Sequence, residues 1–99
     1  MLLYQKKIPF RYECALSIRN TMFYPDFTIR HPDTGKYLYW EHLGLMDDPD
    51  YNRNACSKIQ LYAANNIIPT IQLILTAETL TQPLTYNTVQ HTIQQYFNR

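Results

Sequence analysis

Two acidic residues, Asp26 and Glu41, lie in the segment FYPDFTIRHPDTGKYLYWEHLG at residues 23–44. This segment predicts a β-hairpin that places the two carboxylates side by side on one face. Like charges directly opposite each other destabilise a sheet, so such a pair is usually neutralised by a divalent metal, a base or a proton. The chemistry most often carried out on such a pair is metal-assisted hydrolysis of a phosphodiester.

The register of this hairpin follows from its turn and its apolar pattern. Apolar and polar residues alternate on both sides of the Pro-Asp-Thr-Gly turn at residues 32–35, as in half-buried strands. If Arg30 pairs with Tyr37, Asp26 falls opposite Glu41, with Cβ atoms roughly 5 Å apart. The other face then carries the expected core side chains, Phe27, Ile29, Leu38 and Trp40. A slip of one residue would expose these apolar side chains to water.

A third carboxylate is expected on the same surface. Residues 10–18 alternate strictly and predict one continuous strand. A turn that pairs Arg19 with Met22 would set Glu13 diagonal to Asp26 on the polar face. Glu13 is therefore a secondary candidate metal ligand, although a solvated residue or a partner of a nearby arginine explains it more simply.

The residues after the hairpin predict a helix, a buried strand and a second helix. Asp48 is a good N-cap and Pro49 suits the first helical position, and the helix should end at about Asn65. The apolar run at residues 71–76 fits a strand covered on both faces. Residues 85–97 have the apolar spacing of a helix. The predicted fold class is therefore α/β, with a mixed sheet built from a three-strand antiparallel meander followed by helix, strand and helix.

Composition is consistent with one small packed domain. The chain has 99 residues, of which 45% are hydrophobic and only two are glycine. Cys14 and Cys56 have no metal-ligand spacing and are expected to be buried free thiols in a reducing compartment. The formal net charge of +1 counts mildly against a large phosphate-contact surface. No apolar run approaches the about 20 residues of a membrane helix, and the first ten residues lack a signal-peptide core, so we expect a cytoplasmic protein.

The layout of Pro25-Asp26 on one predicted strand and Glu41 on the next resembles the PD-(D/E)XK nuclease superfamily, also called restriction-endonuclease-like. The segment YPDFTIRHPDTGKYLYWEHLG is similar to a segment of bacterial members, some of them associated with helicases or nucleases. The resemblance covers the chain from about Phe10 onward. It implies a single nuclease-like domain over residues 1–99, with a first core helix that is short or missing. It also implies Mg²⁺- or Mn²⁺-dependent hydrolysis of DNA, with Asp26 and Glu41 as catalytic metal ligands.

One position departs from the pattern of this superfamily. Leu43 stands two residues after Glu41, where the resemblance implies a lysine that positions the attacking water. Some members carry this lysine on the following helix instead. Lys58, which borders the apolar stripe of the predicted helix, is therefore the candidate catalytic lysine, with Gln60 and Tyr62 as secondary polar candidates. A surface lysine whose stem covers apolar side chains is the alternative for Lys58.

The resemblance also implies a third metal ligand, the backbone carbonyl of His42. The His42 ring is expected on the core face, so we do not assign it as a base. Mg²⁺ prefers oxygen ligands and keeps several waters. Two carboxylates and one carbonyl would leave positions for water and for a phosphate oxygen.

Three functions stay open from the sequence. The first is an active metal-dependent nuclease, which the Asp26–Glu41 pair favours. The second is a nuclease-like fold without activity that serves as a nucleic-acid or protein interaction module, which Leu43 and the near-neutral charge favour. The third is a small structural protein with an incidental acidic hairpin. The expected partner is DNA and not a membrane. The domain could form a homodimer that covers a sheet edge, or belong to a larger nuclease or helicase-associated system.

Overall fold

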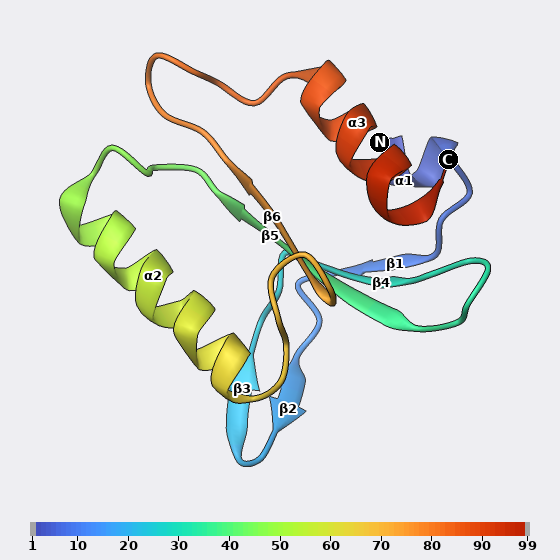
Figure 1. The fold of residues 1–99 in the computed structure, drawn as a ribbon, viewed down its shortest axis with the longest axis horizontal. Coiled ribbons are helices and arrows are strands. Elements are labelled where there is room, and N and C mark those ends of the chain that lie inside the picture. The colour runs from blue at the N-terminus through green and yellow to red at the C-terminus, as the bar shows by residue number, and fades with distance from the viewer. Residues whose placement is uncertain (1, 99) are drawn as a thin grey trace.

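The computed structural model describes residues 2–98 and forms an α/β fold (Figure 1). Along the chain its elements are α1 (Leu2–Gln5), β1 (Phe10–Tyr12), β2 (Leu16–Ile18), β3 (Thr21–Phe23), β4 (Phe27–Arg30), β5 (Tyr37–Leu43), α2 (Pro49–Ala64), β6 (Leu73–Ala77) and α3 (Tyr86–Phe97). The helix that precedes the first strand is short, with four residues in α1.

A mixed four-stranded sheet forms the centre, in the order β1-β4-β5-β6. β1, β4 and β5 are antiparallel neighbours, whereas β6 runs parallel to β5, with α2 as the crossover between them. Thr28 lies opposite Tyr39, and Arg30 lies opposite Tyr37. The predicted register of the acidic hairpin and the predicted mixed sheet are both confirmed.

The predicted continuous strand over residues 10–18 is wrong. The chain leaves β1 at Glu13, whose φ of 49° lies in the left-handed region that ends a strand. The Glu13 N–H still donates to the Asp26 carbonyl at 3.0 Å. Beyond this break β2 and β3 form a separate two-stranded ribbon, which projects from the rest of the fold in Figure 1.

The register of this ribbon differs by two residues from the predicted one. Ile18 pairs with Thr21 across a two-residue turn at residues 19–20, and Arg11 lies opposite Thr28. Both turn residues have positive φ, 49° and 67°, as in the primed turns whose twist suits a tight hairpin. The predicted pairing of Arg19 with Met22 placed a two-residue turn one position later, at residues 20–21. The observed Arg-Asn turn lacks the Asn-Gly signal that would have marked it.

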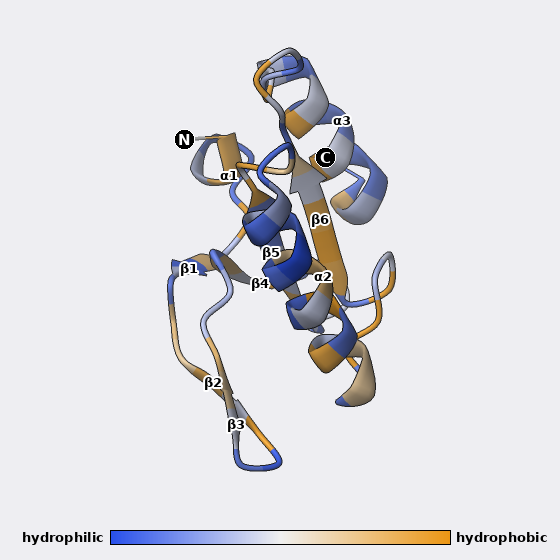
Figure 2. Ribbon diagram, turned by 90° about the vertical axis from the view of Figure 1, so that its left-hand side faces the viewer, coloured by the Kyte–Doolittle hydropathy of each residue, from blue (hydrophilic) through white to orange (hydrophobic). Residues whose placement is uncertain are grey.

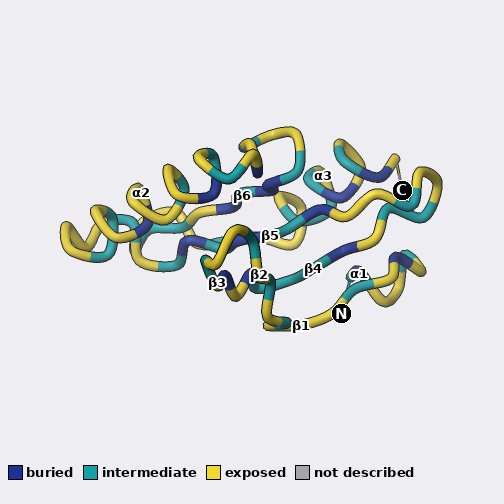
Figure 3. The backbone as a smooth tube through the Cα atoms, turned by 90° about the horizontal axis from the view of Figure 1, so that it is seen from below, coloured by how far each residue is buried: buried dark blue, intermediate teal, exposed yellow. Residues whose placement is uncertain are grey.

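Two apolar cores cover the two faces of the sheet. Figure 1 shows α2 on one side of the sheet and α1 with α3 on the other. The core beneath α1 and α3 contains Leu3, Ile8, Ile29, Leu38, Trp40, Ile74, Ile93 and Phe97, with Phe27 partly buried. The core beneath α2 contains Phe23, Tyr62, Ile67 and Leu73. The predicted core side chains of the hairpin are thus confirmed, and Figure 3 shows the buried segments gathered along the middle of the sheet strands.

Both long helices begin where the sequence predicts. The Asp48 side chain accepts from the N–H groups of Asp50 and Tyr51 at 2.9 and 3.1 Å, and Thr85 accepts from the N–H of Thr88 at 3.2 Å to begin α3. The prediction that Asp48 is the N-cap of α2 is therefore confirmed. In Figure 2 β6 is coloured hydrophobic over most of its length, whereas α2 is mainly hydrophilic, as expected of a strand between two layers and a helix on the outside.

The second core also fastens the projecting ribbon to α2. The Phe23 ring of β3 stacks on the Tyr62 ring of α2, with centroids 4.3 Å apart. Both side chains are buried. The ribbon is therefore held at its base by the same helix that covers the sheet.

Two smaller expectations are tested by the structure. Both cysteines are free, but Cys14 is only half-buried and Cys56 is exposed, so their predicted burial is wrong. Across residues 2–98, none of the helices combines the length and apolar character that crossing a membrane requires.

Candidate active site

Asp26 and Glu41 come together at one end of the acidic hairpin. Asp26 directly precedes β4, and its N–H donates to Glu41 Oε1 at 3.1 Å. The Asp26 Oδ2 atom in turn accepts from the N–H of His42 at 2.7 Å. These two hydrogen bonds fix both carboxylates at the position that the hairpin register predicts.

The predicted lysine reaches this pair from the helix. Lys58 of α2 forms an ion pair with Glu41 Oε2. Glu41 is buried, with 4% of its surface exposed, whereas the Lys58 side chain is 43% exposed. The structure therefore brings Asp26, Glu41 and Lys58 together, and the amine is open to solvent on one side.

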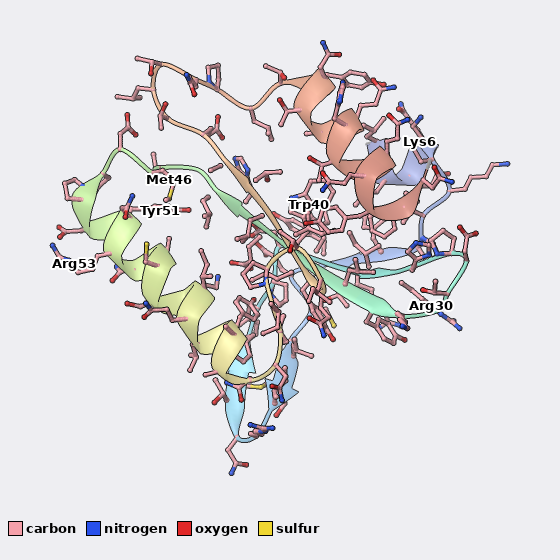
Figure 4. The ribbon with its side chains drawn as sticks, in the orientation of Figure 1. Lys6, Arg30, Trp40, Met46, Tyr51 and Arg53 are labelled. Atoms are coloured by element: carbon pink, nitrogen blue, oxygen red, sulfur yellow. The ribbon has the colours of Figure 1, made fainter. Side chains whose placement is uncertain are left out.

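A pocket of about 200 Å³ opens over these three residues. Its remaining lining residues are His42, Leu43, Tyr51, Asn54 and Ala55. Figure 4 shows Tyr51 on the side of α2 that faces the sheet, whereas Arg53 points away from it. The Tyr51 hydroxyl accepts from the N–H of Gly44 at 3.0 Å and so joins α2 to the end of β5. The pocket walls thus come from β5, α2 and the residue before β4.

The carboxyl group of Glu41 is buried beneath helix α2. Its burial raises the pKa of the Glu41 carboxyl; the hydrogen bond and charge of Lys58 lower it in part, and the neighbouring Asp26 charge raises it again. The net shift is upward. Glu41 therefore holds its proton more tightly in the folded protein than in the unfolded chain.

This raised pKa predicts a pH dependence of stability. Between the ordinary and the raised pKa, the folded protein holds the Glu41 proton more tightly than the unfolded chain, so stability falls as pH rises through that interval. Urea unfolding of the metal-free protein in a chelator should show this fall, and the Glu41→Gln variant should lack it. If the difference in unfolding free energy between wild type and variant stays flat or rises with pH, the raised pKa of Glu41 is contradicted. Glu78 has a lowered pKa and gives a slope of opposite sign. Because both proteins contain Glu78, its contribution cancels in the difference.

A buried hydroxyl lies next to this carboxylate. Tyr62 has no exposed surface, and its hydroxyl makes no hydrogen bond within residues 2–98. Burial raises the Tyr62 pKa, and the charge of Glu41 raises it further. Tyr62 is not among the residues that line the carboxylate pocket, and its ring belongs to the core beneath α2.

The donor atoms at the pocket fit a hard divalent cation. Asp26 Oδ1 takes part in no hydrogen bond that the structure describes, and the His42 carbonyl projects to the same strand edge as its N–H, which faces Asp26. No cluster of three or more His, Cys, Asp or Glu side chains that could hold a metal forms in the described part of the chain. Two carboxylates with a carbonyl still suit Mg²⁺, which is commonly bound through one or two carboxylates and several waters.

The structure does not bring Glu13 into this group. Glu13 is exposed at the break after β1, and its carboxylate interacts with the Tyr12 hydroxyl, whose pKa it raises. The predicted surface with three carboxylates is therefore wrong. The reason is the left-handed backbone at Glu13, where the chain leaves β1.

A polar network on the opposite face of the sheet was not predicted. The Trp40 indole N–H donates to Thr76 Oγ1 at 3.0 Å, and the same hydroxyl lies 2.8 Å from His42 Nδ1. His42 Nε2 lies 2.7 Å from Glu78 Oε1, and Glu78 Oε2 accepts from the N–H of Leu84 at 3.1 Å. The hydrogen bond from His42 lowers the Glu78 pKa. The His42 ring thus lies on the core face as expected, away from the carboxylate pair.

The remaining candidates are placed less close to the carboxylates. Leu43 is buried against the pocket and provides no cation there. Gln60 is exposed on α2 and is not among the residues that line the pocket. Lys58 is the lysine that lines it.

Comparison of the chain with protein-family models, with curated proteins and with solved structures gave no match.

Proposed function

We propose that the chain is a metal-dependent nuclease domain that hydrolyses DNA phosphodiester bonds. The observation that carries the proposal is the convergence of Asp26, Glu41 and Lys58 in one pocket, from three separate elements. Support also comes from topology, since a meander, a crossover helix, a parallel strand and a last helix follow in the order that a restriction-endonuclease-like fold implies.

Each residue has a distinct task in this proposal. A bound Mg²⁺ or Mn²⁺ would polarise the phosphate and lower the pKa of a bound water. Asp26 and Glu41 would hold the cation together with the carbonyl of His42, and the His42 N–H keeps the Asp26 carboxylate oriented. Lys58 adds a fixed positive charge where negative charge develops and helps to orient the attacking water.

The position of Lys58 explains how the chain can lack a lysine at residue 43. Its ammonium reaches Glu41 from α2, so the amine lies beside the carboxylates although it comes from a different element. Leu43 instead completes the apolar wall of the pocket. The charge that the resemblance implies on the strand is thus supplied by the helix.

The alternative function is an inactive nuclease-like module that binds nucleic acid or protein. The ion pair of Lys58 with Glu41 favours it, because the carboxylate is already neutralised by a side chain. The two functions differ in what they require of a metal. An active site must bind the cation at Asp26 and Glu41, whereas an inactive module has no such requirement.

Calorimetric titration with Mn²⁺ tests the proposal directly. We expect weak binding of about one ion to the wild-type protein, and no binding to the Asp26→Asn variant. Asparagine can still accept the hydrogen bond from the His42 N–H, so the fold should persist, as circular dichroism would show. Equal heats for both proteins, or none for the wild type, would reject a metal site at this pair.

A further inference from the structure

A second pocket lies beside the carboxylate pocket. It has a volume of about 570 Å³ and shares Asp26, His42 and Tyr51 with the first pocket. The second pocket extends over the face of the sheet that carries Trp40 and Thr76, toward α1 and α3. The end of β5 and the residue before β4 therefore separate two adjoining spaces.

The chemistry of the second pocket differs from that of the first. Its walls are mainly apolar and aromatic, formed by Leu2, Leu3, Tyr12, Phe27, Trp40, Leu45, Leu84 and Val89. Among the described residues that line it, none is a lysine or an arginine. A phosphate would find no cation there, whereas an uncharged planar group would find apolar contacts.

A row of aromatic rings leads into this pocket from the solvent. Tyr12 is 65% exposed, and its ring centroid lies 5.5 Å from that of Phe27. Phe27 packs edge-on against Trp40 at 6.3 Å. The exposed Tyr12 ring thus lines the pocket and packs against Phe27.

We propose that this pocket receives one unstacked nucleobase of the strand whose phosphate lies at Asp26, Glu41 and Lys58. The inference rests on the proposed nuclease function and names its substrate class: single-stranded or flapped nucleic acid. The phosphate and base of one nucleotide need neighbouring sites, one charged and one apolar, and the shared residue Asp26 joins two such sites. A base inside a duplex would first have to unpair and leave its stack.

The size of the pocket agrees with this ligand. Pockets for small organic ligands are typically about 300–1,000 Å³, mostly apolar, with few polar groups. Apart from its two tyrosines, the polar side chains of this pocket are Asp26 at the shared border and His42 with Thr76, which already bond each other. Recognition would therefore rest on stacking, which accepts any base, and we expect little sequence preference.

The test uses an eight-nucleotide thymidine oligonucleotide and a blunt hairpin duplex, with binding measured by fluorescence anisotropy in Ca²⁺ and cleavage in Mn²⁺. We expect the single strand to be cut at least about tenfold faster than the duplex.

Tyr12→Ala should weaken binding of the oligonucleotide by roughly fivefold to 100-fold, as expected for one stacked base, with Mn²⁺ affinity unchanged. Val89→Phe, which fills the pocket from α3, should have the same effect. Tyr37→Ala, an exposed tyrosine at the far end of β5, is the matched control.

An oligonucleotide with a single abasic residue sharpens this test. The abasic residue is placed at the nucleotide beside the cleaved bond. The wild-type protein should then bind this oligonucleotide more weakly than the intact one, whereas Tyr12→Ala should bind both equally. Equal losses in both proteins, or equal cleavage of duplex and single strand, would overturn the base pocket while metal binding at Asp26 leaves the nuclease proposal intact. Absence of Mn²⁺ binding would instead reject the nuclease proposal itself.

Discussion

The Asp26→Asn variant should lose Mn²⁺-dependent DNA cleavage by roughly a thousandfold or more. The metal contributes several kcal/mol to stabilisation of the transition state, and each 1.36 kcal/mol is a factor of ten in rate. In the proposed metal site Asp26 has one carboxylate oxygen available for the cation, because Oδ2 accepts from the His42 N–H and Oδ1 makes no hydrogen bond within the described residues. The measurement is single-turnover cleavage of a labelled oligonucleotide.

A matched control separates chemistry from folding in this experiment. Asp47 is also an aspartate whose carboxylate accepts a backbone N–H, that of Leu80 at 3.0 Å, but it does not line the carboxylate pocket. Asp47→Asn should keep the wild-type rate. Cleavage that survives both Asp26→Asn and Glu41→Gln would come from a contaminant or another site and would refute the assignment.

The Lys58→Met variant should lose cleavage while it keeps its metal. Removal of one preorganised charge from the site of developing charge costs about a hundredfold to a thousandfold in rate. Mn²⁺ affinity should stay equal or increase, because the Lys58 ammonium that neutralises Glu41 is gone. The pKa of Glu41 should rise further for the same reason, since the Lys58 contacts lower it.

The outcome distinguishes a catalytic role of Lys58 from a purely structural one. If Lys58 only neutralises a buried acid, its loss should lower stability without a selective fall in the cleavage step. Lys36→Met, on the exposed turn between β4 and β5, is the control for a changed surface charge. Unchanged cleavage in Lys58→Met would remove this residue from the mechanism.

The acidic hairpin could be predicted because several local signals agree. The alternation of apolar residues, the turn at residues 32–35 and the burial of Trp40 all require one register, and that register brings Asp26 to Glu41. Lys58 could be predicted from helical periodicity, because it follows the buried Ala55 by three residues and precedes the buried Tyr62 by four. The hairpin register and the position of Lys58 both follow from residues that are close together in the sequence.

The parts that the sequence did not reveal depend on the backbone and on distant contacts. Strict alternation hid the break at Glu13, since a left-handed residue at a non-glycine position carries no local signal. The contacts of His42 with Thr76 and Glu78 arise from the parallel pairing of β5 with β6, which places residues more than 30 positions apart side by side. The second pocket likewise requires α1, β4, β5 and α3 together.

The stacked pair of Phe23 and Tyr62 connects the ribbon of β2 and β3 to the helix that lines the carboxylate pocket. Asp26 follows Phe23 by only three residues, and Lys58 precedes Tyr62 by one helical turn. The two rings therefore join the segment that leads into Asp26 to the helix turn that follows Lys58, so the ribbon and the carboxylate pocket share one support.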